Sequence, residues 1–144
     1  MKSGGVGRAH VEPAGLGIAR CAAPIRSTEL SWRGELLACG ALKEYSPSVA
    51  EIAAIAVSRE AHGRGLGRTI VRAVEDLARM RDIYDVFALT LQPEFFAAIG
   101  YQRVDRARYP EKIRRDCLGC MRRFACNEIC FAKNLMLEEI DQAA

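Results

Sequence analysis

Three glycines at alternate positions are the residues whose type and spacing point most clearly to chemistry. Gly63, Gly65 and Gly67 directly follow an apolar run at 49–57 and open an amphipathic segment. The first N–H groups of a helix have no intrahelical acceptors and carry partial positive charge. Because glycine adopts positive φ and lets the backbone approach an anion, this strand–turn–helix predicts a phosphate-binding site.

Two other phosphate motifs and one purely structural reading compete with this interpretation. A P-loop is excluded because no Lys-Ser or Lys-Thr follows the glycines. The dinucleotide fingerprint needs a further glycine where the chain has Arg68, so that match is poor. For the glycines alone, a tight turn that binds nothing remains an open alternative.

The elements expected around this turn indicate a mixed α/β (α+β) fold. Arg33-Gly34 between two short apolar runs predicts a hairpin, and Pro47 falls in the next connection. In chain order, we expect strands at 28–32, 35–42 and 49–57, a helix that the glycines open, a strand at 85–91, a short helix at 93–99 and strands at 101–104 and 129–137.

The helix that follows the glycines is expected to bury one face. An apolar stripe at helical spacing is formed by Leu66, Ile70, Val71, Val74, Leu77 and Ala78. The opposite, polar side holds Arg68, Arg72, Glu75, Asp76 and Arg79. Arg72 and Asp76 are spaced to form an i,i+4 ion pair.

The composition and net charge are those of one soluble domain, and the charge suits the binding of small anionic molecules. The 144 residues are 50% hydrophobic and 27% charged, with a net charge of +3. That charge is too small for a dedicated nucleic-acid binder, and we expect neither a membrane span nor a signal peptide, hence a cytoplasmic protein. Residues 1–27, broken by seven Gly and Pro, are expected to be a poorly ordered or atypical N-terminal segment before a domain at 28–144.

Three segments carry a resemblance to a known family. The run from His62 to Gly67 resembles the GNAT motif Arg/Gln-x-x-Gly-x-Gly/Ala, which binds the pyrophosphate of acetyl-CoA. Residues 94–101 resemble the second GNAT signature, and residues 34–42 resemble the hairpin before the motif. The resemblance covers roughly residues 30 to 105. It implies a central, mostly antiparallel twisted sheet flanked by helices, with an incomplete N-terminal part.

The resemblance implies an acetyl-CoA-dependent N-acetyltransferase that acts on a small-molecule amine. Residues 87–96 and 110–126 are similar to short, stand-alone bacterial N-acetylglutamate synthases, so the α-amine of L-glutamate, in the first step of arginine biosynthesis, is the leading acceptor. Another small amine or a peptide N-terminus is an alternative. A second alternative is a non-catalytic acyl-CoA or metal-binding module, because the segment that forms the wall of the acceptor site in GNAT domains is replaced here. Either the N-terminal segment is degraded or misassigned, or a partner subunit, as in a homodimer, completes that site.

The resemblance also implies cofactor contacts and two departures from the family pattern. Contacts with acetyl-CoA are expected from Ile55, Ala56, Val57, His62, Gly63, Arg64, Gly65, Leu66, Gly67 and Arg68. His62 replaces the Arg or Gln that opens the motif. Phe96 falls where many GNAT enzymes have a tyrosine acid, which argues against that acid in this chain.

Two residues are candidate catalytic groups. Strand alternation places Glu51 on one face with Ala53, Ile55 and Val57, where it would act as a base through water; a solvent-facing glutamate is the alternative. Thr90 ends the next strand, and it would hydrogen-bond cofactor or substrate, or cap the helix that starts at Pro93.

A basic segment at 103–123 is the expected contact for an acidic acceptor. Arginine binds carboxylates bidentately, and Arg106 and Arg108 are the leading candidates. The alternative is a solvated basic surface.

A cysteine cluster overlaps this segment. Cys117, Cys120, Cys126 and Cys130 lie within fourteen residues, which suits zinc or an iron–sulfur cluster. Free thiols or a redox-sensitive pair are the alternative, with Cys130 pointing into the core.

Overall fold

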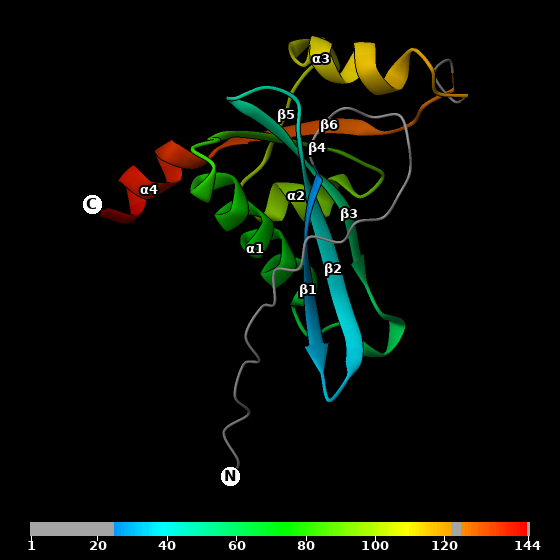
Figure 1. Ribbon diagram of the computed structural model, residues 1–144, viewed down its shortest axis with the longest axis vertical. Coiled ribbons are helices and arrows are strands. Elements are labelled where there is room, and N and C mark those ends of the chain that lie inside the picture. Colours follow the sequence, from blue (N-terminus) through cyan, green and yellow to red (C-terminus); the bar gives the residue numbers. More distant parts are fainter. Residues whose placement is uncertain (1–24, 122–124, 144) are drawn as a thin grey trace.

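A six-stranded sheet in the order β1-β2-β3-β4-β6-β5 organises the computed structural model, which describes residues 25–121 and 125–143 (Figure 1). The strands are β1 Ile25–Trp32, β2 Glu35–Glu44, β3 Val49–Val57, β4 Asp85–Thr90, β5 Gln102–Arg103 and β6 Ile129–Asn134. β3 and β4 pair in parallel, and the other neighbours are antiparallel. The predicted mixed α/β class with a mostly antiparallel sheet is confirmed.

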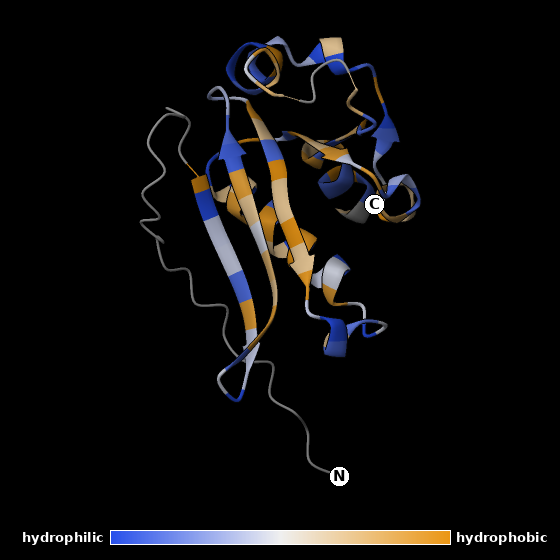
Figure 2. Ribbon diagram, turned by 90° about the vertical axis from the view of Figure 1, so that its right-hand side faces the viewer, coloured by the Kyte–Doolittle hydropathy of each residue, from blue (hydrophilic) through white to orange (hydrophobic). Residues whose placement is uncertain are grey.

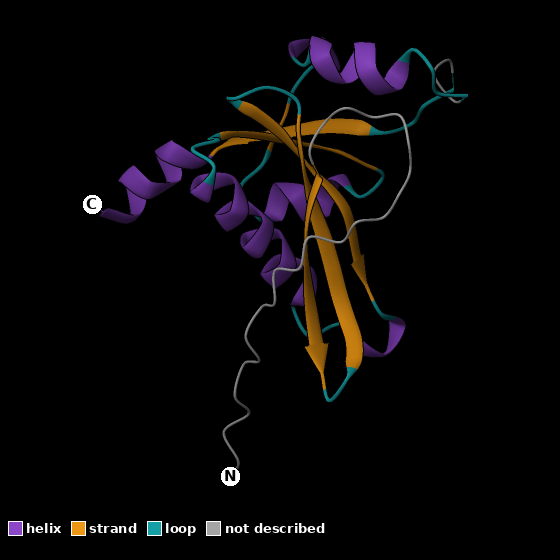
Figure 3. Cartoon of the chain, viewed as in Figure 1, coloured by secondary structure: helices purple, strands orange, loops and turns teal. Residues whose placement is uncertain are grey.

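Helices lie on both sides of the part of the sheet formed by β4 and β6 (Figure 3). They are α1 Leu66–Met80, α2 Pro93–Ala98, α3 Pro110–Lys112, the π-helix η3 Ile113–Cys117 and α4 Leu135–Ala143, with 3₁₀ turns η1 Arg59–Ala61 and η2 Arg106–Arg108. α1 and α2 pack on one face, where Val86 and Ala88 of β4 join the main core. Phe87 points to the other face, toward Tyr109 at the start of α3. No helix in the described ranges has the length and apolar character that a bilayer crossing requires.

The hairpin forms as the sequence predicts, but strand ends differ. Arg33 and Gly34 have φ of 51° and 81°, the positive values that a two-residue type I′ turn needs. β1 begins at Ile25, three residues before the predicted start; residues 1–24 lie outside the described part of the chain. The strand predicted to Leu137 ends at Asn134, because the Asn134 Oδ1 accepts the Met136 N–H at 3.0 Å and starts α4.

α1 buries the predicted apolar stripe, and it also buries one residue of the predicted polar face. Ile70 and Val74 are fully buried, and the hydropathy colouring of Figure 2 shows apolar segments where sheet and helix meet. Glu75 is only 3% exposed, so its placement on the solvent side was wrong. Asp76 forms its ion pair with Arg79 (3.0 Å) and not with Arg72.

β3 contains a bulge that changes which side chains face the helix. Ala41 pairs with Ala53 and Cys39 with Ala56, so two residues of β3 oppose Gly40. The extra residue is Ala54, whose φ is 52°. Gly40 is required by the packing, since a Cβ there would lie 2.7 Å from the Ile55 Cδ1 and 3.0 Å from the Val74 Cγ2.

We therefore expect Gly40→Ala to lower the free energy of unfolding by about 1–3 kcal/mol, because the added methyl group overpacks the contact between bulge and helix. Urea denaturation followed by circular dichroism measures this loss. The control is Gly119→Ala, where an added Cβ meets nothing within 4 Å and the change should stay within about 0.5 kcal/mol. A Gly40→Ala protein as stable as the wild type would contradict the packing described.

Candidate active site

The sheet splits between β3 and β4. Their parallel pairing runs from Val49 with Asp85 to Glu51 with Phe87 and then stops, whereas β4 stays paired with β6 as far as Thr90. In Figure 1, β1 to β3 run along the long axis of the molecule while β6 lies across it. Beyond Glu51, the β4-facing edge of β3 is therefore left without strand hydrogen bonds.

A groove of about 1150 Å³ lies at this split. Of the predicted cofactor residues, it is lined by Ile55, Ala56, Val57, His62, Gly63, Gly65, Leu66, Gly67 and Arg68. Both predicted catalytic residues, Glu51 and Thr90, line the same groove. Arg64 is exposed and lies outside the lining. The fold thus brings the glycine turn, the unpaired strand edge and the candidate base into one continuous space.

The glycine turn presents free amides to the groove. Gly63 and Gly65 have φ of 78° and 73°, and Gly65 is the N-cap of α1. The first bond of the helix runs from the Thr69 N–H to the Gly65 carbonyl at 3.2 Å. The amides of Leu66, Gly67 and Arg68 therefore have no acceptor within the helix. Together with the dipole of a 15-residue helix, they form a site for an anion.

Two contacts fix this turn. A Cβ at Gly67 would lie 3.2 Å from the Phe95 ring, so glycine lets α1 lie close against α2. A ring nitrogen of His62 lies 3.1 Å from the Val57 carbonyl oxygen. His62, which departs from the family motif, thus holds the end of β3 to the start of the turn.

Glu51 lies buried at the opposite end of the groove. Its Oε2 accepts hydrogen bonds from the Tyr45 hydroxyl and the Lys112 Nζ, both at 2.9 Å, and the residue is 6% exposed. The prediction that Glu51 shares a face with Ile55 and Val57 was wrong. The bulge at Ala54 reverses the alternation, so Ile55 packs toward α1 while Glu51 points to the other face.

A network of partly buried charges ties Glu51 to the segment 109–117. Asp116 accepts hydrogen bonds from Lys43 and Tyr45 and, at 2.9 Å, from Lys112. Burial disfavours the Asp116 carboxylate, but these three donors outweigh it and lower its pKa. Burial and the two neighbouring carboxylates raise the pKa of the Tyr45 phenol, which stays a donor. Burial opposes the charge of Lys112, yet Glu51 and Asp116 raise its pKa, so it stays a cation.

Tyr109 anchors the start of the same segment. Its ring stacks on Phe87 with centroids 4.0 Å apart, and its hydroxyl donates to the Asp85 Oδ1 at 2.8 Å. The segment is thus held to the sheet at both ends and walls the groove near Glu51. Sequence reasoning missed Tyr45, Lys112 and Asp116. The i,i+4 spacing of Lys112 and Asp116 is a signal from which a helix could have been predicted there.

Thr90 has a structural partner. Its Oγ1 accepts the Gln92 N–H at 2.8 Å, which closes the turn before α2. The N-cap of α2 is Gln92, so Thr90 supports the entry to that helix and does not cap it. Its hydroxyl proton remains available to a bound molecule, because the oxygen is an acceptor in this bond.

The two predicted substrate arginines are not part of the groove lining. The Arg106 Nη2 donates to the Glu128 carbonyl at 2.8 Å and to the Cys126 Sγ at 3.3 Å, and the hydrogen bond with that thiol raises the pKa of the guanidinium. Arg108 lies over the Tyr109 ring at 5.8 Å. Arg106 thus contacts the segment before β6, and of the predicted basic segment it is Lys112 that lines the groove, at the end where Glu51 lies.

The four cysteines are spread out. Among residues 25–121 and 125–143, no group of three or more His, Cys, Asp or Glu side chains is arranged to hold a metal ion. Cys120 is exposed, Cys126 contacts Arg106, and Cys130 is buried on the Phe87 side of the sheet, where burial raises its pKa to about 11. Cys117 ends η3. The described structure thus does not assemble the predicted zinc or iron–sulfur site, and all four are free thiols.

Comparison with known proteins agrees with this geometry. The Acetyltransferase (GNAT) family profile matches residues 18–103. An uncharacterized N-acetyltransferase from Chlorobaculum tepidum is 36% identical over 104 residues, which are 72% of this chain and 67% of that protein. This chain belongs to the GNAT family of N-acetyltransferases.

Two further relatives are named for amino-acid substrates. An amino-acid acetyltransferase from Mycobacterium tuberculosis is 35% identical over 72 residues, 50% of this chain and 41% of the relative. The structure of N-acetylglutamate synthase from Neisseria gonorrhoeae, complexed with coenzyme A and N-acetyl-glutamate, has a TM-score of 0.67 and 32% identity over 76% of this chain and 25% of that chain. This chain therefore spans less than half the length of either relative.

We expect Gly65→Asp to weaken coenzyme A binding by about tenfold or more, because it places a carboxylate among amides that would face a phosphate. Isothermal titration calorimetry with coenzyme A measures the change. Gly34→Asp is the matched control, since Gly34 also has positive φ (81°) and open space around it but lies in the β1–β2 turn. Equal affinity in the two variants would rule out the glycine turn as the anion site.

We expect Asp116→Asn to destabilise the protein by about 2 kcal/mol or more at pH 7, because two lysines and Tyr45 lose their charged acceptor. The lowered pKa of Asp116 stabilises the folded state above the unfolded pKa of about 3.9. The difference in free energy of unfolding between the wild type and Asp116→Asn should therefore shrink as the pH falls from about 5 to 3.

Urea denaturation at several pH values tests this dependence. Asp76→Asn, which removes a solvent-exposed ion pair, is the control and should change stability by less than about 1 kcal/mol. A stability gap for Asp116→Asn that stays constant from pH 7 to pH 3 would be incompatible with a charged Asp116 in the network.

Proposed function

We propose that this protein transfers the acetyl group of acetyl-CoA to the α-amine of an amino acid, with L-glutamate as the first acceptor to test. The observation that carries the proposal is the single groove that joins the free amides of α1 to the partly buried Glu51–Lys112 pair. One end suits the anionic part of the donor, and the other suits a zwitterionic acceptor.

The donor would lie along the split in the sheet. The amides of Leu66, Gly67 and Arg68 would bind the diphosphate of coenzyme A. The pantetheine arm carries two amides, which suit the unpaired edge of β3 in the way that an added strand suits a sheet edge. Small side chains at Ala53, Ala54 and Ala56 leave room for this approach. The thioester would then reach the part of the groove between Glu51 and Thr90.

The chemistry would be direct transfer. The amine nitrogen bonds to the acetyl carbon, the C–S bond breaks, and coenzyme A leaves as a thiolate. Glu51 would take the amine proton through water, since it is the carboxylate that lines this end of the groove beside an ammonium partner. Phe96 has no proton to give, so the thiolate would be protonated from solvent or another group.

Lys112 favours an acidic acceptor. It is a cation held in the groove wall by Glu51 and Asp116, and its side chain is 14% exposed. A carboxylate of the acceptor would meet this ammonium near the base. The similarity to N-acetylglutamate synthase and amino-acid acetyltransferases supports the same class of acceptor.

The acceptor is tested by measuring thiol release from acetyl-CoA with a panel of amines. L-glutamate should give the highest kcat/KM, followed by L-glutamine, which has the same shape without the side-chain charge, while spermidine and a neutral peptide should react poorly. Release with spermidine or the peptide but not with glutamate would redirect the assignment to another amine. Binding of acetyl-CoA without release for any amine would favour a non-catalytic acyl-CoA module.

We expect Glu51→Gln to lower kcat by about 10²-fold or more while coenzyme A affinity stays unchanged, because the variant loses the base and keeps the anion site. Steady-state kinetics with the best acceptor and calorimetry with coenzyme A separate the two effects. Glu29→Gln, on the exposed side of β1, is the control and should leave both values unchanged. A Glu51→Gln protein with wild-type kcat would remove Glu51 from the mechanism.

A further inference from the structure

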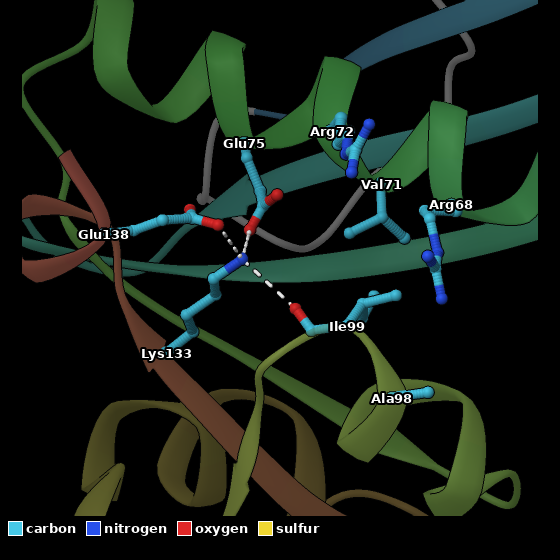
Figure 4. A pocket seen from close by; sticks show the side chains of 8 residues that line it. All are labelled: Arg68, Val71, Arg72, Glu75, Ala98, Ile99, Lys133 and Glu138. Carbon is cyan, nitrogen blue, oxygen red and sulfur yellow. Dashed lines mark hydrogen bonds and ion pairs between the residues drawn. The ribbon is translucent and has the colours of Figure 1, made fainter. Parts of the chain in front are cut away.

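A second, smaller pocket of about 190 Å³ lies between α1, α2 and β6, next to the groove (Figure 4). Arg68 lines both spaces, so the pocket continues from the glycine turn along α1. Arg72 lies one helical turn further on and also lines the pocket, and Figure 4 shows the Arg68 side chain extending from α1 in the direction of Ala98. Ala98 and Ile99 form the opposite, apolar wall.

The acidic residues of this pocket are already neutralised. Lys133 Nζ lies 3.0 Å from both Glu75 and Glu138, and it also donates to the Ile99 carbonyl at 3.3 Å. Glu75 accepts a further hydrogen bond from the Tyr101 hydroxyl at 3.0 Å, and Glu138 pairs with Arg79 at 3.0 Å. The carboxylates on the floor therefore have cationic partners of their own.

The two arginines of this pocket, in contrast, have no acidic partner among the described residues. Within the part of the chain that the structure describes, neither Arg68 nor Arg72 forms a hydrogen bond or an ion pair, and both are exposed. Asp76, the partner expected for Arg72, is bound to Arg79. The pocket thus presents two free guanidinium groups over a neutralised floor, an arrangement that suits a phosphate dianion.

Distance along the helix relates this pair to the donor. Arg68 and Arg72 lie about 4.5 and 10 Å beyond Gly65 along the axis, at about 1.5 Å per residue. In coenzyme A, one ribose separates the diphosphate from the 3′-phosphate. A diphosphate held by the first amides of α1 would therefore leave the 3′-phosphate within reach of these side chains.

We infer that Arg68 and Arg72 bind the 3′-phosphate of coenzyme A and make the protein selective for coenzyme A over donors that lack this group. The inference rests on the donor assigned under the proposed function and is independent of the acceptor. Acyl chains carried on a protein-bound phosphopantetheine have no 3′-phosphate. They would lose this contact and would be poor donors.

The test is calorimetric binding of coenzyme A and 3′-dephospho-coenzyme A to the wild type, Arg68→Gln and Arg72→Gln. We expect the wild type to bind coenzyme A about tenfold or more tightly than the dephospho form, because charge-assisted hydrogen bonds are lost. Arg72→Gln should weaken coenzyme A binding and leave the dephospho form unchanged, and the double variant should bind both equally. Arg114→Gln, an exposed arginine on η3, is the control and should keep the full preference.

Each outcome decides the matter. The proposed site is wrong if the wild type binds coenzyme A and the dephospho form equally. It is also wrong if the preference for coenzyme A persists in both single variants and in the double variant. Because binding needs no acceptor, failure of the amino-acid panel would leave this result intact. If the wild type binds neither ligand, the donor assignment and this site are both wrong.

Discussion

The groove depends on how far β4 follows β3. β2 holds β3 along most of its length, but β4 pairs with it over three residues and then turns away with β6. A continuous sheet would satisfy the backbone groups of β3 with another strand and leave no room for a ligand. Because the strands part after Glu51, the same β3 provides a buried carboxylate at one end and a free backbone edge at the other.

The bulge at Ala54 links this split to the helix. It shifts the alternation of β3, so that Ile55 and Val57 pack toward α1 and α2 while Glu51 faces the other side. Gly40 admits the bulge, and Gly67 lets α1 approach Phe95. The main core therefore fixes the start of α1 relative to the strand edge. The end of the groove that holds Glu51 is fixed from the opposite face, by Tyr109 and the Lys112–Asp116 network.

The sequence predicted what is encoded locally. Positive φ at Gly63 and Gly65, the hairpin turn at Arg33-Gly34 and the buried stripe of α1 follow from residue type and spacing, and the structure has them. Of the residues that the family resemblance implies for the cofactor, all but Arg64 line one groove in the structure.

The predictions that failed concern contacts between segments that are distant in sequence. A bulge has no fixed sequence signature, so strict alternation put Glu51 on the wrong face. Lys112 and Tyr45 meet Glu51 across 61 and 6 residues of sequence, and spacing cannot show that convergence. Glu75 was expected in solvent because a lone glutamate on a helix usually lies there, whereas Lys133 and Tyr101 satisfy it in the core. Four cysteines close in sequence suggested a metal, but the described fold directs them to different surroundings.

The central claim is that the amides at the start of α1 and along the free edge of β3 hold the donor. The most direct measurement is a ¹H–¹⁵N NMR titration of the protein with coenzyme A. The account predicts large shifts for the amides of Leu66, Gly67 and Arg68 and for residues 54–57, with Gly34 and Gly119 unmoved. Saturable binding that leaves the α1 amides unshifted would contradict it.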